Sequence, residues 1–253
     1  MKKEVKKNRI LVIGETCVDI FNYGKVERLA PEAPAPVFCT AETLKSLGMA
    51  MNVKNNIVSL GLECDIVTNS GWENITKTRF IDKRTNHMFL RVDSENNGYK
   101  NLDVGKIVDK LDKYEAVIIS DYCKGFLTTE DILKISSSHP NVFLDTKKIL
   151  NYDWCRNVKF IKINFSEFKR TEHVLKKEFD DKLIITLGKD GSKHNGKIFS
   201  VPEVEIKDLA GAGDTFIASL VVKYVETGNI EDSIIFANKC ATKVVQKRGV
   251  SIV

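Results

Sequence analysis

The sequence lacks the features that mark secreted, membrane-spanning or zinc-binding proteins. Its six cysteines include no C-x-x-C pair, which argues against zinc and thioredoxin-like sites and favours reduced thiols. No apolar stretch reaches the roughly 20 residues of a membrane span. No small-residue cleavage site follows the basic residues 1–9, so a signal peptide is not expected. We therefore expect a soluble cytoplasmic protein with no membrane partner.

The sequence also lacks a large excess of either positive or negative charge. The 253 residues include 39 Lys and Arg against 34 Asp and Glu, and the resulting net charge is +5. The basic residues are scattered, so nucleic acid is not an expected partner. A small positive excess does suit an enzyme whose substrates carry phosphate. The length and the 43% hydrophobic content fit one large α/β domain with a small appendage.

Short apolar runs alternate with amphipathic stretches along most of the chain. This alternation predicts a mostly parallel sheet covered by helices on both faces. The expected strands are residues 10–14, 65–68, 116–120, 142–145, 160–163 and 182–187. The expected helices are residues 46–60, 102–111 and 128–136, one beginning at 166, and residues 211–227 and 230–246.

An early hairpin does not fit that rhythm. Residues 79–81 and 88–92 suit two strands across a polar turn, which predicts a separate small sheet. Such a sheet leaves strand edges unpaired and an apolar face uncovered, with Ile81, Phe89 and Leu90 as candidates. Because exposed edges are usually paired or covered, we expect a homodimer joined through this sheet.

The segment from Asp208 to Phe216 is the most informative for chemistry. Gly211 and Gly213 let the backbone approach a ligand, and a long amphipathic helix begins beside them. Free amides and the dipole at a helix start attract anions, so this is a candidate oxyanion hole for a transferring phosphoryl group. Asp214 in the same turn is a candidate general base, and the dipole should favour its ionised form. Taken alone, the same residues are equally ordinary helix caps.

Other phosphate-binding motifs are absent or incomplete. No G-x-G-x-x-G occurs. Residues 191–198 approach the Walker A pattern, but Ile198 stands where a magnesium-binding hydroxyl belongs, and no helix follows. This segment is better interpreted as a hairpin turn around Asn195-Gly196.

Several motifs together resemble a known family. The segment from Asp208 to Asp214 resembles the C-terminal signature of the ribokinase-like (PfkB) carbohydrate kinases. Other segments resemble a subgroup, the heptose 7-phosphate kinase domain of the bifunctional lipopolysaccharide heptose enzyme. They are Pro31-Glu-Ala-Pro34, Ser120-Asp-Tyr-Cys-Lys-Gly125, Asn164-Phe-Ser-Glu167 and Gly249-Val-Ser-Ile-Val253.

The resemblance implies a three-layer α/β/α domain with a small β lid formed by parts of about residues 15–45 and 76–95. It implies ATP-dependent transfer of the γ-phosphate to a sugar or sugar phosphate, most closely D-glycero-D-manno-heptose 7-phosphate at O1. Two alternatives remain: a ribokinase-like kinase for another sugar or a nucleoside, and a non-catalytic nucleotide- or sugar-binding relic. Retention of the Gly-Ala-Gly-Asp motif (residues 211–214) argues against the relic.

The resemblance also implies residue roles around the transferred phosphate. Asp214 would be the base, and the oxyanion hole would comprise Gly211, Ala212 and Gly213. Mg²⁺ and the phosphates would be organised by Asn164 and Glu167, with Glu167 acting through water. Asp145 and Lys147 would lie on a phosphate-side loop. Two of these residues also have a purely structural interpretation. Glu167 could be a negative charge that stabilises a helix N-terminus, and Lys147 could be a solvated surface lysine.

The remaining implied roles concern the sugar, the base and a second cation. The sugar would be held by Asp19, Gly48 and Asn52. The nucleotide would lie along Thr186, Gly188 and Gly191, with Asn238 near the adenine. A monovalent cation, K⁺, would lie near Asp208 and Ser251. Asp19 could equally end a strand, and Asn52 could equally be a helix-surface residue.

A phosphorylated sugar would need further cations. Those in or beside the expected lid are Lys77, Arg79, Arg84 and Arg91. For each singly, a solvated charged hairpin is at least as good an interpretation. One departure from the family concerns the sugar site directly, because Gly48-Met49 stands where the family usually has two glycines.

Overall fold

A central eight-stranded sheet organises the computed structural model, which describes residues 9–94, 100–175 and 177–253. Its strand order is β12-β11-β10-β9-β8-β7-β1-β4. The parallel strands are β1 (Arg9–Gly14), β4 (Glu63–Val67), β7 (Ala116–Asp121), β8 (Val142–Thr146), β9 (Phe160–Asn164) and β10 (Leu183–Thr186). An antiparallel hairpin, β11 (Ser192–His194) and β12 (Lys197–Phe199), closes one edge. The inner parallel strands are largely apolar on both faces because helices cover both.

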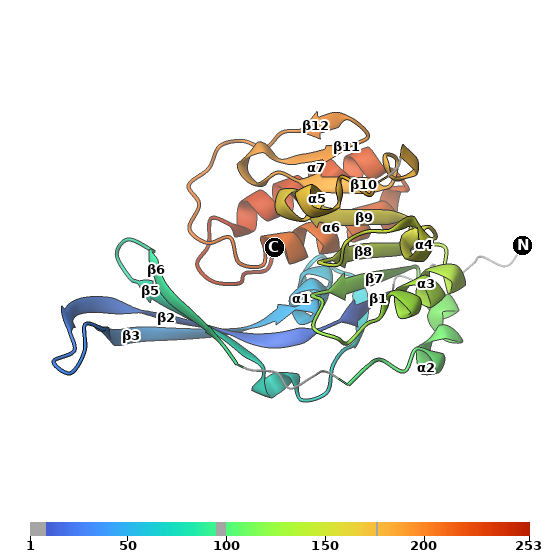
Figure 1. Ribbon diagram of the computed structural model, residues 1–253. Coiled ribbons are helices and arrows are strands. Elements are labelled where there is room, and N and C mark those ends of the chain that lie inside the picture. The colour runs from blue at the N-terminus through green and yellow to red at the C-terminus, as the bar shows by residue number, and fades with distance from the viewer. Residues whose placement is uncertain (1–8, 95–99, 176) are drawn as a thin grey trace, which may run out of the picture.

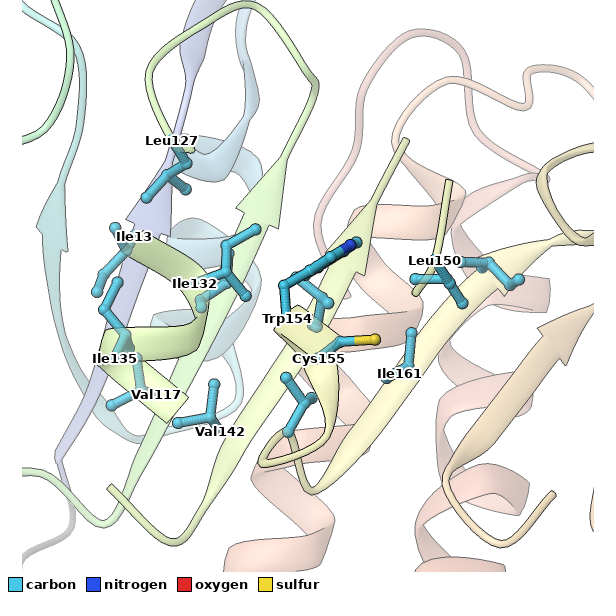
Figure 2. Close-up of a cluster of buried hydrophobic side chains, with 14 of the residues drawn as sticks. Ile13, Val117, Leu127, Ile132, Ile135, Val142, Leu150, Trp154, Cys155 and Ile161 are labelled. Atoms are coloured by element: carbon cyan, nitrogen blue, oxygen red, sulfur yellow. The ribbon is translucent and has the colours of Figure 1, made fainter. Parts of the chain in front are cut away.

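Helices form a layer on each face of this sheet (Figure 1). One face packs against α1 (Ala50–Ser59), α6 (Ala212–Thr227) and α7 (Ile230–Val244). The opposite face packs against α2 (Gly105–Val108), α3 (Thr129–Ser138), α4 (Tyr152–Cys155) and α5 (Phe165–Thr171). Figure 2 shows this second interface, where Ile132 and Ile135 of α3 and Trp154 of α4 lie over the strands. The expected three-layer α/β/α architecture is confirmed.

A second sheet of four strands projects from the first (Figure 1). Its order is β3-β2-β5-β6, with β2 (Thr16–Leu29), β3 (Pro36–Met49), β5 (Thr76–Asp82) and β6 (Met88–Asp93). Only the β2–β5 pair is parallel. We call it the small sheet. Residue 95, the last residue of the segment 76–95 expected to form part of the lid, lies outside the described residues. It packs Phe21, Tyr23 and Ile81 against Ala210 and Val250 of the large domain.

Three local expectations were wrong. The helix expected at 46–60 begins only at Ala50, because residues 36–49 pair with β2 along their whole length. The helix expected at 102–111 is limited to α2 and a short 3₁₀ turn, η2 (Leu111–Lys113). Ile81, expected on the open apolar face, is buried beneath the small sheet.

Further 3₁₀ turns connect the elements. They are η1 (Trp72–Asn74), η3 (Lys177–Phe179) and η4 (Gly188–Asp190). In the part of the chain that the structure describes, no helix combines the length and apolar character needed to cross a membrane.

Candidate active site

The carboxyl ends of the parallel strands bring the polar residues of the site to one edge. Glu15 follows β1, Tyr122 follows β7, and Asp145, Asn164 and Thr186 lie at the ends of β8, β9 and β10. In open α/β sheets, ligands bind at this edge. The N-terminus of α6 lies against it, because Phe216, Ile217 and Leu220 bury the helix on the sheet.

Asp214 is a buried carboxylate in the first turn of α6. The Tyr122 hydroxyl donates to its Oδ1 at 2.6 Å, and Asn52 Nδ2 donates to its Oδ2 at 3.0 Å. Burial raises the pKa of Asp214 to about 6, although both hydrogen bonds act to lower it. Desolvation is the largest influence on this carboxyl group and outweighs the groups that favour its ionised form. The carboxylate remains the main form at neutral pH.

Tyr122 is a contact of Asp214 that sequence reasoning missed as an individual residue. Its loop is fixed by Glu15, whose carboxylate accepts hydrogen bonds from the amides of Tyr122 at 2.8 Å and Lys124 at 2.9 Å. The ammonium groups of Lys77 and Lys147 each lie 5.0 Å from the Tyr122 ring centroid. Tyr122 therefore contacts Lys77 of the small sheet and Lys147 of the large domain through its ring, and Asp214 through its hydroxyl.

The residues expected to hold the sugar come from the small sheet and from the helix that follows it: Asp19 lies on β2, Gly48 on β3 and Asn52 on α1. Asp19 Oδ1 accepts a hydrogen bond from Arg79 Nη1 at 2.6 Å. A Cβ at Gly48 would fall 1.9 Å from Asp19 Oδ2, so any side chain there would force Asp19 out of its present position. Asn52 donates to Asp214 and, at 3.5 Å, to the carbonyl oxygen of Gly211. Burial raises the pKa of the Cys17 thiol to about 12, and the charges of Lys77, Asp19 and Asp214 act on that same thiol.

Met49 takes a backbone conformation that usually belongs to glycine. Its φ is 61°, in the left-handed region, and it forms the junction between β3 and α1. The two glycines that the family resemblance implies here have a physical reason. A methionine adopts this conformation at an energetic cost, with its side chain buried.

The four cations considered for a substrate phosphate divide into two pairs. Lys77 and Arg79 lie beside Tyr122 and Asp19. Arg84 is exposed in the β5–β6 turn. Arg91, expected to contact substrate, is half exposed on the edge strand β6 and makes two hydrogen bonds of 2.8 Å to Asp93. The structure therefore does not bring Arg91 to the Asp214 cluster.

Asn164 and Glu167 form a reciprocal helix cap at the start of α5. Asn164 Oδ1 accepts from the Glu167 amide, and Glu167 Oε2 accepts from the Asn164 amide, both at 2.8 Å. Lys147 Nζ donates to Glu167 Oε1 at 2.7 Å. Although burial opposes ionisation, these donors lower the pKa of Glu167. Both oxygens are occupied, so the predicted magnesium contact fits better through water than directly. Over residues 9–94, 100–175 and 177–253 no group of three or more His, Cys, Asp or Glu is arranged for metal binding.

Lys162 is a second residue that sequence reasoning missed. It lies within β9, is 5% exposed, and pairs with Asp145 Oδ2 at 2.8 Å. A Cβ at Gly213 would fall 2.9 Å from its Nζ. Burial disfavours its ammonium, but the nearby Asp145 more than compensates, and the pKa of Lys162 is raised. A lysine inside an otherwise apolar buried strand was the available signal in the sequence.

A cavity of about 400 Å³ lies beside the start of α6. This volume is typical of a small-molecule site. It contains all four residues expected to contact the nucleotide, Thr186, Gly188, Gly191 and Asn238, together with Ala212 and Gly213. Its apolar walls include Val201, Ile206, Leu209, Phe216 and Val245. The Ala212 amide donates to the carbonyl oxygen of Leu209 at 3.3 Å, so the better-placed free amides are those of Gly213 and Asp214.

Asp208 links the glycine-rich loop to the C-terminal segment. Its two carboxylate oxygens accept from the amides of Ala210 at 2.9 Å and Gly249 at 3.1 Å. Ser251 Oγ lies 3.4 Å from the carbonyl oxygen of Gly249. The two residues expected near a monovalent cation are thus joined through Gly249, and several oxygens gather there.

Structural comparison places this geometry in a class. Thermotoga maritima ribokinase superposes with a TM-score of 0.72 at 17% identity, over 95% of this chain and 94% of that one. Arabidopsis thaliana ribokinase, solved with ribose and ATP, gives a TM-score of 0.70 at 16% identity over 95% and 93%. A Methanocaldococcus jannaschii nucleoside kinase gives 0.68 at 19% identity over 96% and 93%. The fold is that of the ribokinases.

Sequence comparison gives the family. Residues 51–253 match the model of the pfkB family of carbohydrate kinases. The bifunctional protein HldE of Helicobacter acinonychis is 31% identical over 95% of this chain and 63% of its own length. That of Nitratiruptor sp. is 32% identical over 96% and 62%, so this chain spans less than two thirds of these relatives. The chain belongs to the pfkB carbohydrate kinase family, whose members are phosphotransferases with an alcohol group as acceptor.

Proposed function

We propose that this chain transfers the γ-phosphate of ATP to a phosphorylated sugar, most closely D-glycero-D-manno-heptose 7-phosphate at O1. The observation that carries the proposal is the position of Asp214. This buried carboxylate lies between the cavity at the start of α6 and the group formed by Asp19, Gly48 and Asn52. One residue therefore adjoins both the nucleotide side and the sugar side.

In this mechanism the cavity holds ATP, with the γ-phosphate toward the Gly213 and Asp214 amides. The sugar hydroxyl lies against Asp214, positioned by Asp19 and Asn52. Attack forms a bond from the hydroxyl oxygen to phosphorus and breaks the bond to the ADP oxygen. Asp214 accepts the hydroxyl proton, and the helix-start amides hold the charge on the equatorial oxygens. Positioning and charge stabilisation supply most of the acceleration of phosphoryl transfer.

Two cations complete the proposed site. Asn164 and Glu167 would hold Mg²⁺ through water, and the ion would supply positive charge against the phosphates. Asp208 and Ser251 would hold K⁺, which would supply positive charge beside the glycine-rich loop. The small sheet acts as a lid that covers the sugar and excludes water. We place this activity in the cytoplasm, where ATP and sugar phosphates occur.

Two cations beside the sugar group favour a phosphorylated acceptor. Lys77 forms no ion pair with any described carboxylate, and Arg79 is held by Asp19. A phosphate gains charge-assisted hydrogen bonds from such groups that a hydroxyl cannot supply. The 30% level of identity to bifunctional HldE proteins and the Pro-Glu-Ala-Pro segment point to the same class of substrate.

A kinase for another sugar or for a nucleoside is the second candidate. Met49 favours it, because its side chain and strained backbone adjoin Gly48 at the sugar group and reshape the expected pocket. One of the structures with a similar fold is a nucleoside kinase, so nucleosides belong among the acceptors to be tested.

The test is ATP-dependent phosphorylation across an acceptor panel. We expect kcat/KM for heptose 7-phosphate to exceed that for heptose, ribose and fructose by about 10- to 100-fold, which corresponds to the loss of one contact worth about 1.5–3 kcal/mol. Asp214→Asn serves as the control that turnover comes from this site. Equal or better use of a free sugar contradicts the heptose phosphate proposal and leaves the second candidate.

A further inference from the structure

Lys162 is placed where a structural lysine has little reason to be. On β9 its neighbours Ile161 and Ile163 face the α3–α4 side of the sheet, so Lys162 faces α6. An ammonium buried at this depth is costly unless anions compensate it. Asp145 Oδ2 is its one hydrogen-bond acceptor within the described chain, and an ammonium carries three N–H donors. Two donors are left over in a buried position.

The start of α6 lies directly beside the ammonium of Lys162. Its Nζ is so close beneath Gly213 that an added Cβ there would lie 2.9 Å from it. The first turn of a helix carries partial positive charge, so the ammonium and the start of α6 repel one another. The carboxylate of Asp145 pairs with the ammonium, and the charges of Glu167 and Asp214 also act on it. The two N–H donors without an acceptor among the described residues are left for an oxygen ligand. Gly213 lines the 400 Å³ cavity, so that ligand can come from the cavity.

We propose that Lys162 is a catalytic residue whose ammonium binds the phosphoryl group as it passes from ATP to the acceptor. The proposal rests on the kinase function proposed above. Lys162 transfers no proton: it remains an ammonium while phosphorus exchanges its ADP oxygen for the acceptor oxygen, and Asp214 takes the acceptor's proton. Gly213 is glycine because a side chain would separate the ammonium from the cavity.

The chain offers a matched control in a second buried lysine–aspartate pair. Lys148 Nζ lies 2.8 Å from Asp121 Oδ2 and also donates to the carbonyl oxygen of Leu127 at 2.9 Å. Lys148 is likewise near the carboxyl edge of the sheet, but its side chain is engaged away from the cavity-lining residues. Removing it costs an ion pair of the same chemistry without touching the proposed phosphoryl site.

The experiment compares nucleotide affinities of Lys162→Met, Lys148→Met and the wild type by calorimetry with Mg²⁺. The probes are ADP and the non-hydrolysable triphosphate AMP-PNP. We expect Lys162→Met to weaken AMP-PNP at least tenfold and ADP less than threefold, with the ratio in Lys148→Met equal to that of the wild type. If Lys162→Met leaves the ratio of the AMP-PNP and ADP dissociation constants unchanged, because both affinities fall equally or not at all, the proposal is overturned.

Folding of the variants is controlled separately. If near-ultraviolet circular dichroism shows that Lys162→Met is not native, Lys162→Met/Asp145→Asn removes both charges and is measured in the same way, with the same criterion. A wild type that binds both nucleotides and phosphorylates an acceptor, with no ratio change in the variant, refutes only the role of Lys162. A wild type that binds neither nucleotide refutes the proposed function as well.

Discussion

Asp214 receives its two hydrogen bonds from parts of the chain 92 and 162 residues away, Tyr122 and Asn52. Neither partner could be assigned from the sequence, because nothing local links them to the helix start. The glycines and Asp214 itself were predictable, since their order at a helix start has a chemical meaning. Lys162 was passed over because a strand of apolar residues was interpreted only as core. Individual roles thus depended on tertiary contacts that patterns do not encode.

Tyr122→Phe tests how Asp214 is tuned. The hydrogen bond from Tyr122 lowers the pKa of Asp214, which burial has raised to about 6. A base must be deprotonated, so kcat/KM should fall as pH drops through this value. Loss of the hydrogen bond raises the pKa, and we expect the acid limb of the profile to move up by about one pH unit.

The control for this measurement is Tyr152→Phe, whose ring packs on Phe179 away from Asp214. Its acid limb should coincide with that of the wild type. If the Tyr122→Phe limb coincides as well, Tyr122 does not tune the base.

Glu167→Gln tests the magnesium assignment. The substitution removes the negative charge that pairs with Lys147 while keeping the size of the side chain. We expect the Mg²⁺ concentration for half-maximal rate to rise several-fold, because the charge that attracts the hydrated metal is lost. Glu172→Gln, in an exposed pair with Lys169, is the control. An unaltered titration in Glu167→Gln would count against the assignment.

At the scale of elements, strands and helices with apolar periodicity were predictable and long exposed strands were not. Each apolar run from 116 to 187 forms a buried strand of the sheet. The strand β3 is largely exposed, and its apolar and polar residues do not alternate regularly, so the sequence does not mark it as a strand. Its pairing with β2 from Thr16↔Met49 to Leu29↔Pro36 decides its structure instead. This tertiary pairing displaced the start of the expected helix to Ala50.

We expect two subunits to form a homodimer through the outer face of the small sheet. Phe38 packs edge-on against Phe80 at 5.3 Å and Phe89 at 5.9 Å. Leu90 and Val92 beside them are half exposed, and the strand order leaves the β3 and β6 edges open. Light scattering at micromolar concentration should give a dimer mass.

A charge placed on that face should separate the subunits. We expect Leu90→Asp to give a monomer, because an unpaired carboxylate is costly to bury in an apolar interface. Ile198→Asp, at a similarly exposed residue on β12, should remain dimeric. A wild-type monomer would refute the interface.

At the scale of the whole molecule, the two regions that we propose bind ATP and the sugar meet at the start of α6. The cavity between the β10–β12 edge and α7 lies on one side. On the other side lie Asp19 and Gly48 of the small sheet and Asn52 of α1. The small sheet also packs against Ala210 and Val250, next to the glycine-rich loop. The sheet that carries Asp19 and Gly48 is therefore in direct contact with the segment that precedes the proposed oxyanion hole.

The most direct test of this account is the turnover of Asp214→Asn with its ATP affinity measured alongside. A general base is worth about 10²–10⁴ in rate. We expect transfer to the best acceptor of the panel to fall at least 100-fold, while the Kd for ATP stays within about threefold of the wild-type value. A variant that binds ATP normally and keeps more than a tenth of wild-type turnover would contradict the central claim that Asp214 is the base.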